Sequence, residues 1–274
     1  MDLNFLIDFI LEFGVQPKVH EMDKDCLEFI RERIQHEFPY TNETFEKWVL
    51  RYELLDPFKI SENVEVEPEV HFIMRMASEY YMLKVFDAMK IDMSDPNVMS
   101  DISTGNIGTP GRIIKSWVGK NNNDLNELLS ARWCEEPRMA TFPNDKQIKD
   151  PVFVTTKIDA VCSHHLIRFG DDGNNESSVV IGYIPELKLG GISKINRFVE
   201  WCSRRGWLQE DLTNYIGEKI KEVFETRSVY VRMFGMKHGC ASYRGVKDRE
   251  SSTSTTFISG EFKKNPSIIP KRFR

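Results

Sequence analysis

Apolar side chains recur every three or four residues through the first third of the chain, which is the spacing of amphipathic helices. This pattern predicts helices over Asp2–Phe13, over Asp23–Phe38, from Thr41 to a stop at Asp56-Pro57, and over Val70–Met89. The acidic stretch Ser61–Pro68 predicts an extended linker before the last of them. The residues before this linker carry no chemical motif, so we interpret them as an accessory or self-association segment.

A further helix is predicted after a polar loop. Thr109 suits the N-cap and Pro110 the first helical position, where a missing N–H costs nothing. Arg112 and Lys115 then share one helix face. Such a pair is either a solvated basic face or a contact for an anion. Loops are predicted at Asn121–Asn123 and Pro143–Asp150.

The apolar period changes to two after Pro151, which is typical of strands. Two strands are predicted on either side of the polar loop Gly170–Ser177, and two helices follow, the first capped by Ser193. Two more strands end the pattern. The predicted ranges are Phe153–Val161, Val179–Ile184, a helix through Ile195 and Cys202, a helix through Leu212–Phe224, Ser228–Met236 and Ser252–Phe262. This order predicts the α+β class, an antiparallel sheet with two helices on one face.

Composition restricts the classes of function. With 274 residues, of which 41% are hydrophobic, the chain can bury a core in one or two domains. A net charge of −5 does not suggest nonspecific nucleic-acid binding, and no apolar run is long enough to cross a bilayer. Five widely spaced cysteines argue against a disulfide framework and for a reducing compartment, so we expect a cytoplasmic protein.

Two short motifs concentrate the residues suited to catalysis, Cys162-Ser163-His164-His165 and Lys237-His238-Gly239-Cys240. Two thiolates and one imidazole would satisfy a catalytic zinc ion with a fourth position open. The remaining imidazoles could transfer protons near neutral pH. Cys162 and His165 lie on opposite faces of a continuous strand, so a shared site requires the chain to turn there. The residues alone leave buried cysteines and a core histidine as an alternative.

With their neighbours, these motifs resemble the GTP cyclohydrolase I family. The similarity extends from about Glu69 to about Phe262, with the motifs in family order. They are Cys162–Phe169, Ile181–Pro185, Gly191–Arg197, Gln209–Thr213, His238–Cys240 and Arg244–Val246.

The resemblance implies a tunnelling fold, in which subunits combine their sheets into a barrel, and a homo-oligomer that is a decamer. Residues 1–65 lie outside the resemblance and form the helical N-terminal extension that the apolar spacing predicts, whereas the resemblance implies a cyclohydrolase domain over 66–274. That domain would have a helical lead-in at 66–150 and a core at 151–265.

The resemblance also implies an activity, the hydrolysis of the imidazole ring of GTP to give formate and 7,8-dihydroneopterin triphosphate. The product would enter pterin, folate or 7-deazaguanine synthesis. The implied cofactor is zinc (Zn2+), held by Cys162, His165 and Cys240. The implied catalytic acids and bases are His164 and His238.

Substrate contacts follow from the same resemblance. Glu210 would accept hydrogen bonds from the guanine ring N–H and amine together, with Gln209 beside it. The triphosphate would be bound by Ser193, Lys194, Arg197, Arg244, Arg112 and Lys115. The helix with Arg112 and Lys115 would reach into the pocket of a neighbouring subunit.

Three positions depart from the family pattern, and two other functions remain as alternatives. Ser163 replaces a usual Glu, Asp211 replaces a usual Arg, and Gly206-Trp207 stands where Pro-Gln is common. One alternative is another enzyme of this fold, such as a 7-deazaguanine nitrile reductase with a cysteine nucleophile and NADPH. The other is a noncatalytic nucleotide-binding assembly protein.

Overall fold

The structure is a computed structural model that describes residues 22–55, 59–99, 108–121, 125–171, 178–245 and 247–274. The chain divides into two compact units, Met1–Glu127 and Leu128–Arg274. The predicted helix Asp2–Phe13 lies outside the described residues. Among the described helices, none is long and apolar enough to cross a membrane.

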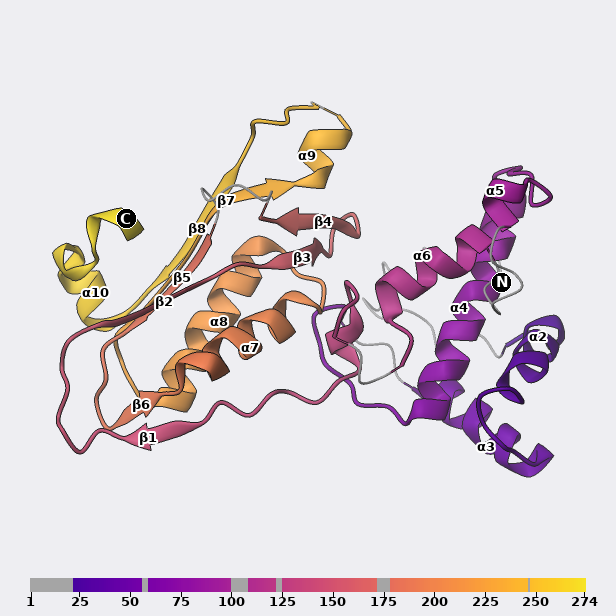
Figure 1. Ribbon diagram of the computed structural model, residues 1–274, viewed down its shortest axis with the longest axis horizontal. Coiled ribbons are helices and arrows are strands. Elements are labelled where there is room, and N and C mark those ends of the chain that lie inside the picture. The colour runs from indigo at the N-terminus through magenta and orange to yellow at the C-terminus, as the bar shows by residue number, and fades with distance from the viewer. Residues whose placement is uncertain (1–21, 56–58, 100–107, 122–124, 172–177, 246) are drawn as a thin grey trace, which may run out of the picture. The chain divides into compact units, whose positions relative to one another are not determined.

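The first unit is helical, as the apolar spacing predicts (Figure 1). Asp23 caps its first described helix by accepting a hydrogen bond from the Cys26 N–H (2.8 Å). Thr41 caps the next helix through a capping box with Thr44. The described helices are α2 (Lys24–Ile34), α3 (Asn42–Glu53), α4 (Pro68–Ala88), α5 (Pro96–Met99) and α6 (Gly108–Val118). The predicted helices in this range are therefore confirmed, although α2 ends before Phe38.

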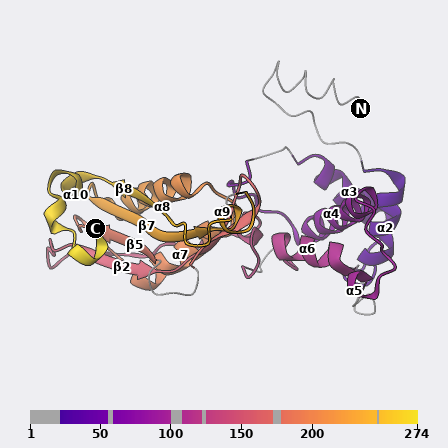
Figure 2. The ribbon, with the colours of Figure 1, turned by 90° about the horizontal axis from the view of Figure 1, so that it is seen from above.

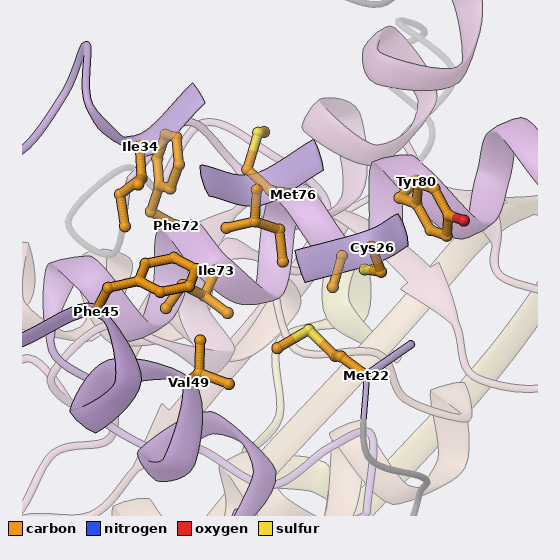
Figure 3. Packing of buried hydrophobic residues seen from close by; sticks show 11 residues of the cluster. Met22, Cys26, Ile34, Phe45, Val49, Phe72, Ile73, Met76 and Tyr80 are labelled. Carbon is orange, nitrogen blue, oxygen red and sulfur yellow. The ribbon is translucent and has the colours of Figure 1, made fainter. Parts of the chain in front are cut away.

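The core of this unit lies where α2 and α3 pack on α4 (Figure 3). Ile30 and Ile34 of α2, Phe45 of α3, and Ile73 and Met76 of α4 are almost completely buried. The apolar stripes of the predicted N-terminal extension and of the helical lead-in therefore form one shared hydrophobic cluster.

Helix α6 begins two residues earlier than the capping prediction, which has Pro110 as the first helical residue. Because Gly108 is already helical, Thr109 lies within the first turn rather than at the cap. Its hydroxyl donates to the Val98 carbonyl (3.3 Å) and accepts from Arg112 Nη2 (2.8 Å). The prediction of Thr109 as the N-cap is therefore wrong, and its hydroxyl instead orients the Arg112 side chain.

The second unit is built on an antiparallel sheet of six described strands, in the order β2-β5-β7-β4-β3, with β8 paired to β7. The long strand β7 pairs with β5 along its first part and with β4 at Lys237 and His238. The described strands are β1 (Thr141–Pro143), β2 (Val152–Thr156), β3 (Asp159–Cys162), β4 (Ile167–Gly170), β5 (Ser178–Tyr183), β6 (Lys188–Gly190), β7 (Val229–His238) and β8 (Thr253–Ile258). Strands β1 and β6 form a separate antiparallel pair.

Two helices, α7 (Ile192–Ser203) and α8 (Gln209–Phe224), cover one face of this sheet. Val231 of β7 pairs with Phe257 of β8, and the Phe257 ring lies against Gly217 of α8. Tyr230 points to the opposite face, where it packs with Phe262 and other residues of the C-terminal segment. This arrangement confirms the α+β prediction of an antiparallel sheet with two helices on one face.

Several short helices complete the unit. Helices α9 and α10 lie at opposite ends of β7 (Figures 1 and 2). The remaining short helices are η2 (Ser130–Arg132), α9 (Gly239–Tyr243), α10 (Gly260–Lys264), η3 (Pro266–Ile268) and η4 (Lys271–Phe273).

Three predicted elements of this unit differ from the structure, and strands β1, β4 and β6 were not predicted. The strand predicted over Phe153–Val161 is two strands, because β2 pairs with β5 whereas β3 pairs with β4. The strand predicted to end at Phe262 ends at Ile258, and a short helix follows. Ser193 does not cap α7: the N-cap is Gly191, and Ser193 lies in the first helical turn.

Candidate functional site

The first motif lies in a tight turn between β3 and β4, residues 162–167, which we call the Cys162 turn. Cys162 is the last residue of β3 and is buried, and it pairs with Ile167 at the start of β4. The turn is closed by the Leu166 N–H, which donates to the Cys162 carbonyl (2.8 Å). Because the chain reverses here, Cys162 and His165 stand at the two ends of one turn. The turn that the zinc hypothesis requires is therefore present.

Strand β4 brings the second motif beside this turn. Phe169 pairs with His238 across the β4–β7 ladder, and their rings stack with centroids 4.7 Å apart. The next residue, Gly239, opens α9, and a Cβ atom there would stand 2.4 Å from Ile167 Cγ2. Only glycine allows this close approach. It leaves Cys240 one residue beyond the point where α9 meets the start of β4.

The donor set fits a zinc ion, although the described residues do not form a closed cage. Among them, no three His, Cys, Asp or Glu side chains already surround a common point. His165 Nδ1 is nevertheless buried without a hydrogen-bond partner among the described residues. Buried polar atoms normally have a partner, so an imidazole nitrogen of this kind suits a metal. Both Cys162 and Cys240 are free thiols.

His165 is surrounded by groups that favour its neutral form. Its ring centroid lies 4.2 Å from that of His164. Desolvation, followed by the charges of His164 and Arg244, lowers the pKa of His165. A neutral imidazole is the form that binds metals. His164 and Arg244 themselves are exposed, so both side chains are accessible to a ligand.

Besides stacking on Phe169, His238 forms a hydrogen bond with Gln209, the first residue of α8. Its Nε2 lies 2.8 Å from Gln209 Oε1, which also accepts a hydrogen bond from the Thr253 hydroxyl (2.5 Å). Because an amide oxygen can only accept, the ring proton lies on Nε2. Burial lowers the pKa of His238, and the nearby Glu210 carboxylate opposes that effect.

Two threonines fix the orientation of the Gln209 amide. Gln209 Nε2 donates to Thr255 Oγ1 (3.0 Å), and the Thr255 hydroxyl lies 2.6 Å from that of Thr213. The Thr213 hydroxyl in turn donates to the backbone carbonyl of Gln209 (2.8 Å). Gln209 is therefore bonded at both ends of its amide. Its neighbour Glu210 is exposed at the start of α8, where a carboxylate is favoured by the helix dipole.

Comparison with known proteins identifies the family of this chain. The family model described as GTP cyclohydrolase I matches residues 102–273. The chain belongs to the GTP cyclohydrolase I family. The GTP cyclohydrolase 1 of Shewanella sp. strain ANA-3 is 33% identical over 190 residues, which cover 69% of this chain and 78% of that protein. The GTP cyclohydrolase 1 of Wigglesworthia glossinidia brevipalpis is 30% identical over 203 residues, covering 74% and 82%.

Among solved structures, the chain is similar to an archaeosine synthase QueF-Like in the apo form. The sequence identity is 21% and the TM-score 0.31, over 40% of this chain and 94% of that one. Family membership and the antiparallel sheet with its two helices identify the core as the tunnelling fold that the motifs imply.

The predicted triphosphate contacts of α7 lie away from the Cys162 turn. Lys194 is in the first turn of α7, which follows β6, whereas Arg204 at its other end faces Asp159 of β3 (3.8 Å). A helix of this length, 12 residues, extends over about 18 Å. Ser193 and Arg197 are exposed on the same helix. Lys194 is therefore at the end of α7 that is remote from Asp159 and β3.

Arg112 and Lys115 belong to the first unit, and the other candidate residues belong to the second. Both lie on α6 and are half-buried. The Arg112 guanidinium also donates to the Asn97 carbonyl (3.3 Å). Their predicted common helix face is consistent with this placement, and their contact with triphosphate stays a prediction.

Several residues that shape the site were not found from the sequence. Phe169 ends the Cys162–Phe169 motif but was given no role, and Thr253 and Thr255 lie in no motif. Phe169 stacks on His238, and the two threonines form hydrogen bonds with the Gln209 side chain. Because alternate residues of a strand share one face, the last predicted strand places Thr253 and Thr255 side by side, and this could have indicated a common contact. Their common partner Gln209 is visible only in the folded structure.

Proposed function

We propose that this chain is a zinc-dependent GTP cyclohydrolase I, which hydrolyses the imidazole ring of GTP to formate and 7,8-dihydroneopterin triphosphate. Family membership supports the reaction class and the substrate. The observation that carries the proposal is the β4–β7 pairing, which puts the turn with Cys162, His164 and His165 next to the end of β7, where His238 is followed by Cys240 in α9.

Cys162, His165 and Cys240 are the residues that would hold the zinc ion. Two thiolates and a neutral imidazole match the preference of zinc for sulfur and nitrogen donors. Bound there, zinc would supply Lewis acidity that lowers the pKa of a water molecule, the nucleophile for C8 of the purine. The Nδ1 of His165, buried and without a hydrogen-bond partner in the described part of the chain, supports this assignment.

His238 and His164 would carry the protons. Gln209 holds the Nε2–H of His238, so exchange with the substrate would use Nδ1. Protonation of a purine nitrogen would offset the charge that develops when the ring is attacked. Because His164 is exposed beside His165, it would act in the later ring opening and loss of formate.

Glu210 would select guanine. Its exposed carboxylate stands next to Gln209, close enough to His238 to influence the pKa of that imidazole. A carboxylate accepts two hydrogen bonds from the ring N–H and amine of guanine, which adenine cannot offer. The base would then lie beside the residue that protonates it.

The triphosphate would be bound by cations from more than one chain. Arg244 lies near His165, whereas Ser193, Lys194 and Arg197 lie along α7, away from the same chain's Cys162 turn. Pooling of the cations of α6 and α7 from neighbouring subunits would complete each site, which requires a homo-oligomer such as a decamer. The product would then enter pterin, folate or 7-deazaguanine synthesis in the cytoplasm.

Incubation of the purified protein with GTP tests the proposal directly. The product, after oxidation and dephosphorylation, is a fluorescent neopterin, and its appearance in proportion to enzyme concentration supports the proposal. Absence of neopterin from zinc-loaded, oligomeric protein would refute it. Incubation with ATP is the matched control, and it should give no fluorescent product.

A further inference from the structure

Trp207 pairs with the backbone that leads into the Cys162 turn. Its N–H donates to the Val161 carbonyl (3.0 Å), and the Ser163 N–H donates to the Trp207 carbonyl (3.1 Å). The two bonds form a parallel bridge opposite Cys162. The connection between α7 and α8 therefore lies beside the end of β3 like a short extra strand, and it fixes the first two residues of the motif.

The Trp207 side chain is anchored in a buried aromatic cage. It is 8% exposed, its Nε1–H donates to the Cys202 carbonyl (2.8 Å), and its ring lies 4.9 Å from that of Tyr215. The cage encloses the Arg205 guanidinium, which lies 4.2 to 5.0 Å from the ring centres of Trp201, Tyr215 and Trp207.

The buried Arg205 guanidinium is stabilised by the aromatic rings around it. Arg205 is only 4% exposed, and its Nε has no hydrogen-bond partner among the described residues. A buried charge needs compensation, which aromatic faces provide here through cation–π attraction. Gly206 has a φ of +75°, a conformation that L side chains rarely adopt, and it lets the chain turn from Arg205 to Trp207.

The same connection also reaches the other half of the site. Two residues after Trp207, Gln209 opens α8 and binds His238 through its amide oxygen. One short segment therefore contacts the Cys162 turn through Trp207 and the end of β7 through Gln209. It therefore links these two motifs in addition to the β3–β4–β7 ladder.

We propose that Trp207 is a positioning residue, which holds Cys162 and Ser163 in register with the start of α8 and hence with His238. The catalytic consequence rests on the proposed function, whereas the structural consequence does not. Misplacement of reacting groups by about 1 Å costs up to roughly a hundredfold in rate. Loss of the Trp207 side-chain anchor should therefore reduce turnover without removing any group that contacts GTP.

Trp207→Leu and Trp201→Leu form a matched pair for the test. Both indoles are buried against Arg205, but only the backbone of Trp207 pairs with the Cys162 turn. Hydrogen exchange of full-length proteins, read by mass spectrometry on a peptide with residues 162–167, reports the opening of that turn. We expect exchange roughly tenfold faster in Trp207→Leu, and unchanged in Trp201→Leu at a similar loss of melting temperature.

Kinetics give the second readout. Trp207→Leu should lower kcat with GTP roughly tenfold or more at an unchanged KM, and Trp201→Leu should leave both close to the parent values. Equal exchange and equal kcat in the two variants would reduce Trp207 to ordinary core packing and overturn the proposal. Should either leucine variant not fold, Trp207→Phe and Trp201→Phe replace the pair, and the same two outcomes decide.

The two hypotheses fail separately. A parent protein that gives no product from GTP contradicts the proposed function, while the exchange comparison still decides whether Trp207 holds the turn. An active parent with indistinguishable variants contradicts only the positioning role.

Discussion

The imidazole of His238 and the amide of Gln209 form a hydrogen-bonded pair, with Nε2 2.8 Å from Oε1; Gln209 is buried, at 2% exposed, and His238 is half-buried. Their partners Thr253 and Thr255 complete the hydrogen bonds of the amide. This network gives His238 one tautomer before any substrate binds. Gln209 therefore orients His238, and its predicted contact with the substrate stays a prediction.

Replacement Gln209→Leu should therefore act on turnover. General acid–base catalysis contributes about 10²- to 10⁴-fold, and a freely rotating His238 would lose part of that, so we expect kcat to fall at least about tenfold. Affinity for GTP should change little. Gln209→Glu, which keeps an acceptor for His238, should recover part of the rate. Loss of GTP affinity at normal kcat would instead favour a substrate contact.

Metal binding and proton transfer should separate in two variants. Cys240→Ser should lose zinc and activity together, because it removes a thiolate donor. His238→Ala should retain zinc and lose about 10²- to 10⁴-fold in kcat, since it removes a proton donor outside the coordination set. Metal analysis of protein purified without chelator measures the first property. Zinc content that is normal in Cys240→Ser would contradict the assigned ligand set.

Guanine selectivity should depend on Glu210. The change Glu210→Gln keeps the shape of the side chain but places an amide N–H where the guanine amine needs an acceptor. We expect a large loss of GTP affinity with an unchanged melting temperature, because the side chain is exposed. A nucleotide titration that shows normal affinity would leave Glu210 as a solvated residue at a helix start.

Composite sites should be visible by mixing subunits. Arg112→Ala and Cys240→Ser proteins should each be nearly inactive, because each lacks one part of every site. After dissociation and reassembly together, some sites should combine an intact zinc set with an intact Arg112. Activity should then recover to a fraction set by statistical mixing. Coassembled mixtures that stay inactive would contradict a contribution of Arg112 from a neighbouring chain.

The first unit should show a pH-dependent stability that comes from a buried carboxyl. Burial raises the pKa of Glu79 from 4.5 to about 7, against the charges of Arg75 and Arg33. The folded protein then retains a proton that the unfolded chain has lost, so this stabilisation disappears as the pH rises from 4.5 to about 7. Glu79→Gln should remove the effect. Relative to the parent, the variant should gain up to roughly 3 kcal/mol of unfolding free energy over that range.

His71 provides a control of opposite sign. Burial lowers its pKa from 6.5 to about 4, so its contribution to stability is present above pH 6.5 and is lost as the pH falls to about 4. His71→Gln should remove a slope that rises with pH. Thermal unfolding of both variants at the two ends of the range measures these differences. Parallel curves for Glu79→Gln and the parent would show that Glu79 is already ionised in the folded protein.

Much of the fold follows from local patterns. The spacing of Ile30 and Ile34, or of Ile73 and Met76, is enough to predict helices and their buried faces. The order of two strands, two helices and two strands follows from the change of period after Pro151. Strand β4 could not be predicted in the same way, because its four residues are too few to show alternation and one of its partners, β7, is distant in sequence.

In the candidate site, too, local motifs predict some residues, whereas contacts between residues distant in sequence were not predicted. Cys162, His165, His238 and Cys240 are chemically conspicuous, and their motifs predict the metal and proton-transfer groups. The bond between Gln209 and His238 joins residues 29 positions apart, and the bridge of Trp207 to Cys162 joins a loop to a strand end. Such contacts depend on tertiary packing, which local sequence spacing does not encode.

The most direct test of the account is the release of formate from GTP labelled with 13C at C8. The parent protein loaded with zinc should convert the label to 13C-formate in step with the neopterin product, and Cys240→Ser should give neither. Formate release by protein free of zinc, or by Cys240→Ser at the parent rate, would contradict a reaction that depends on Cys162, His165 and Cys240.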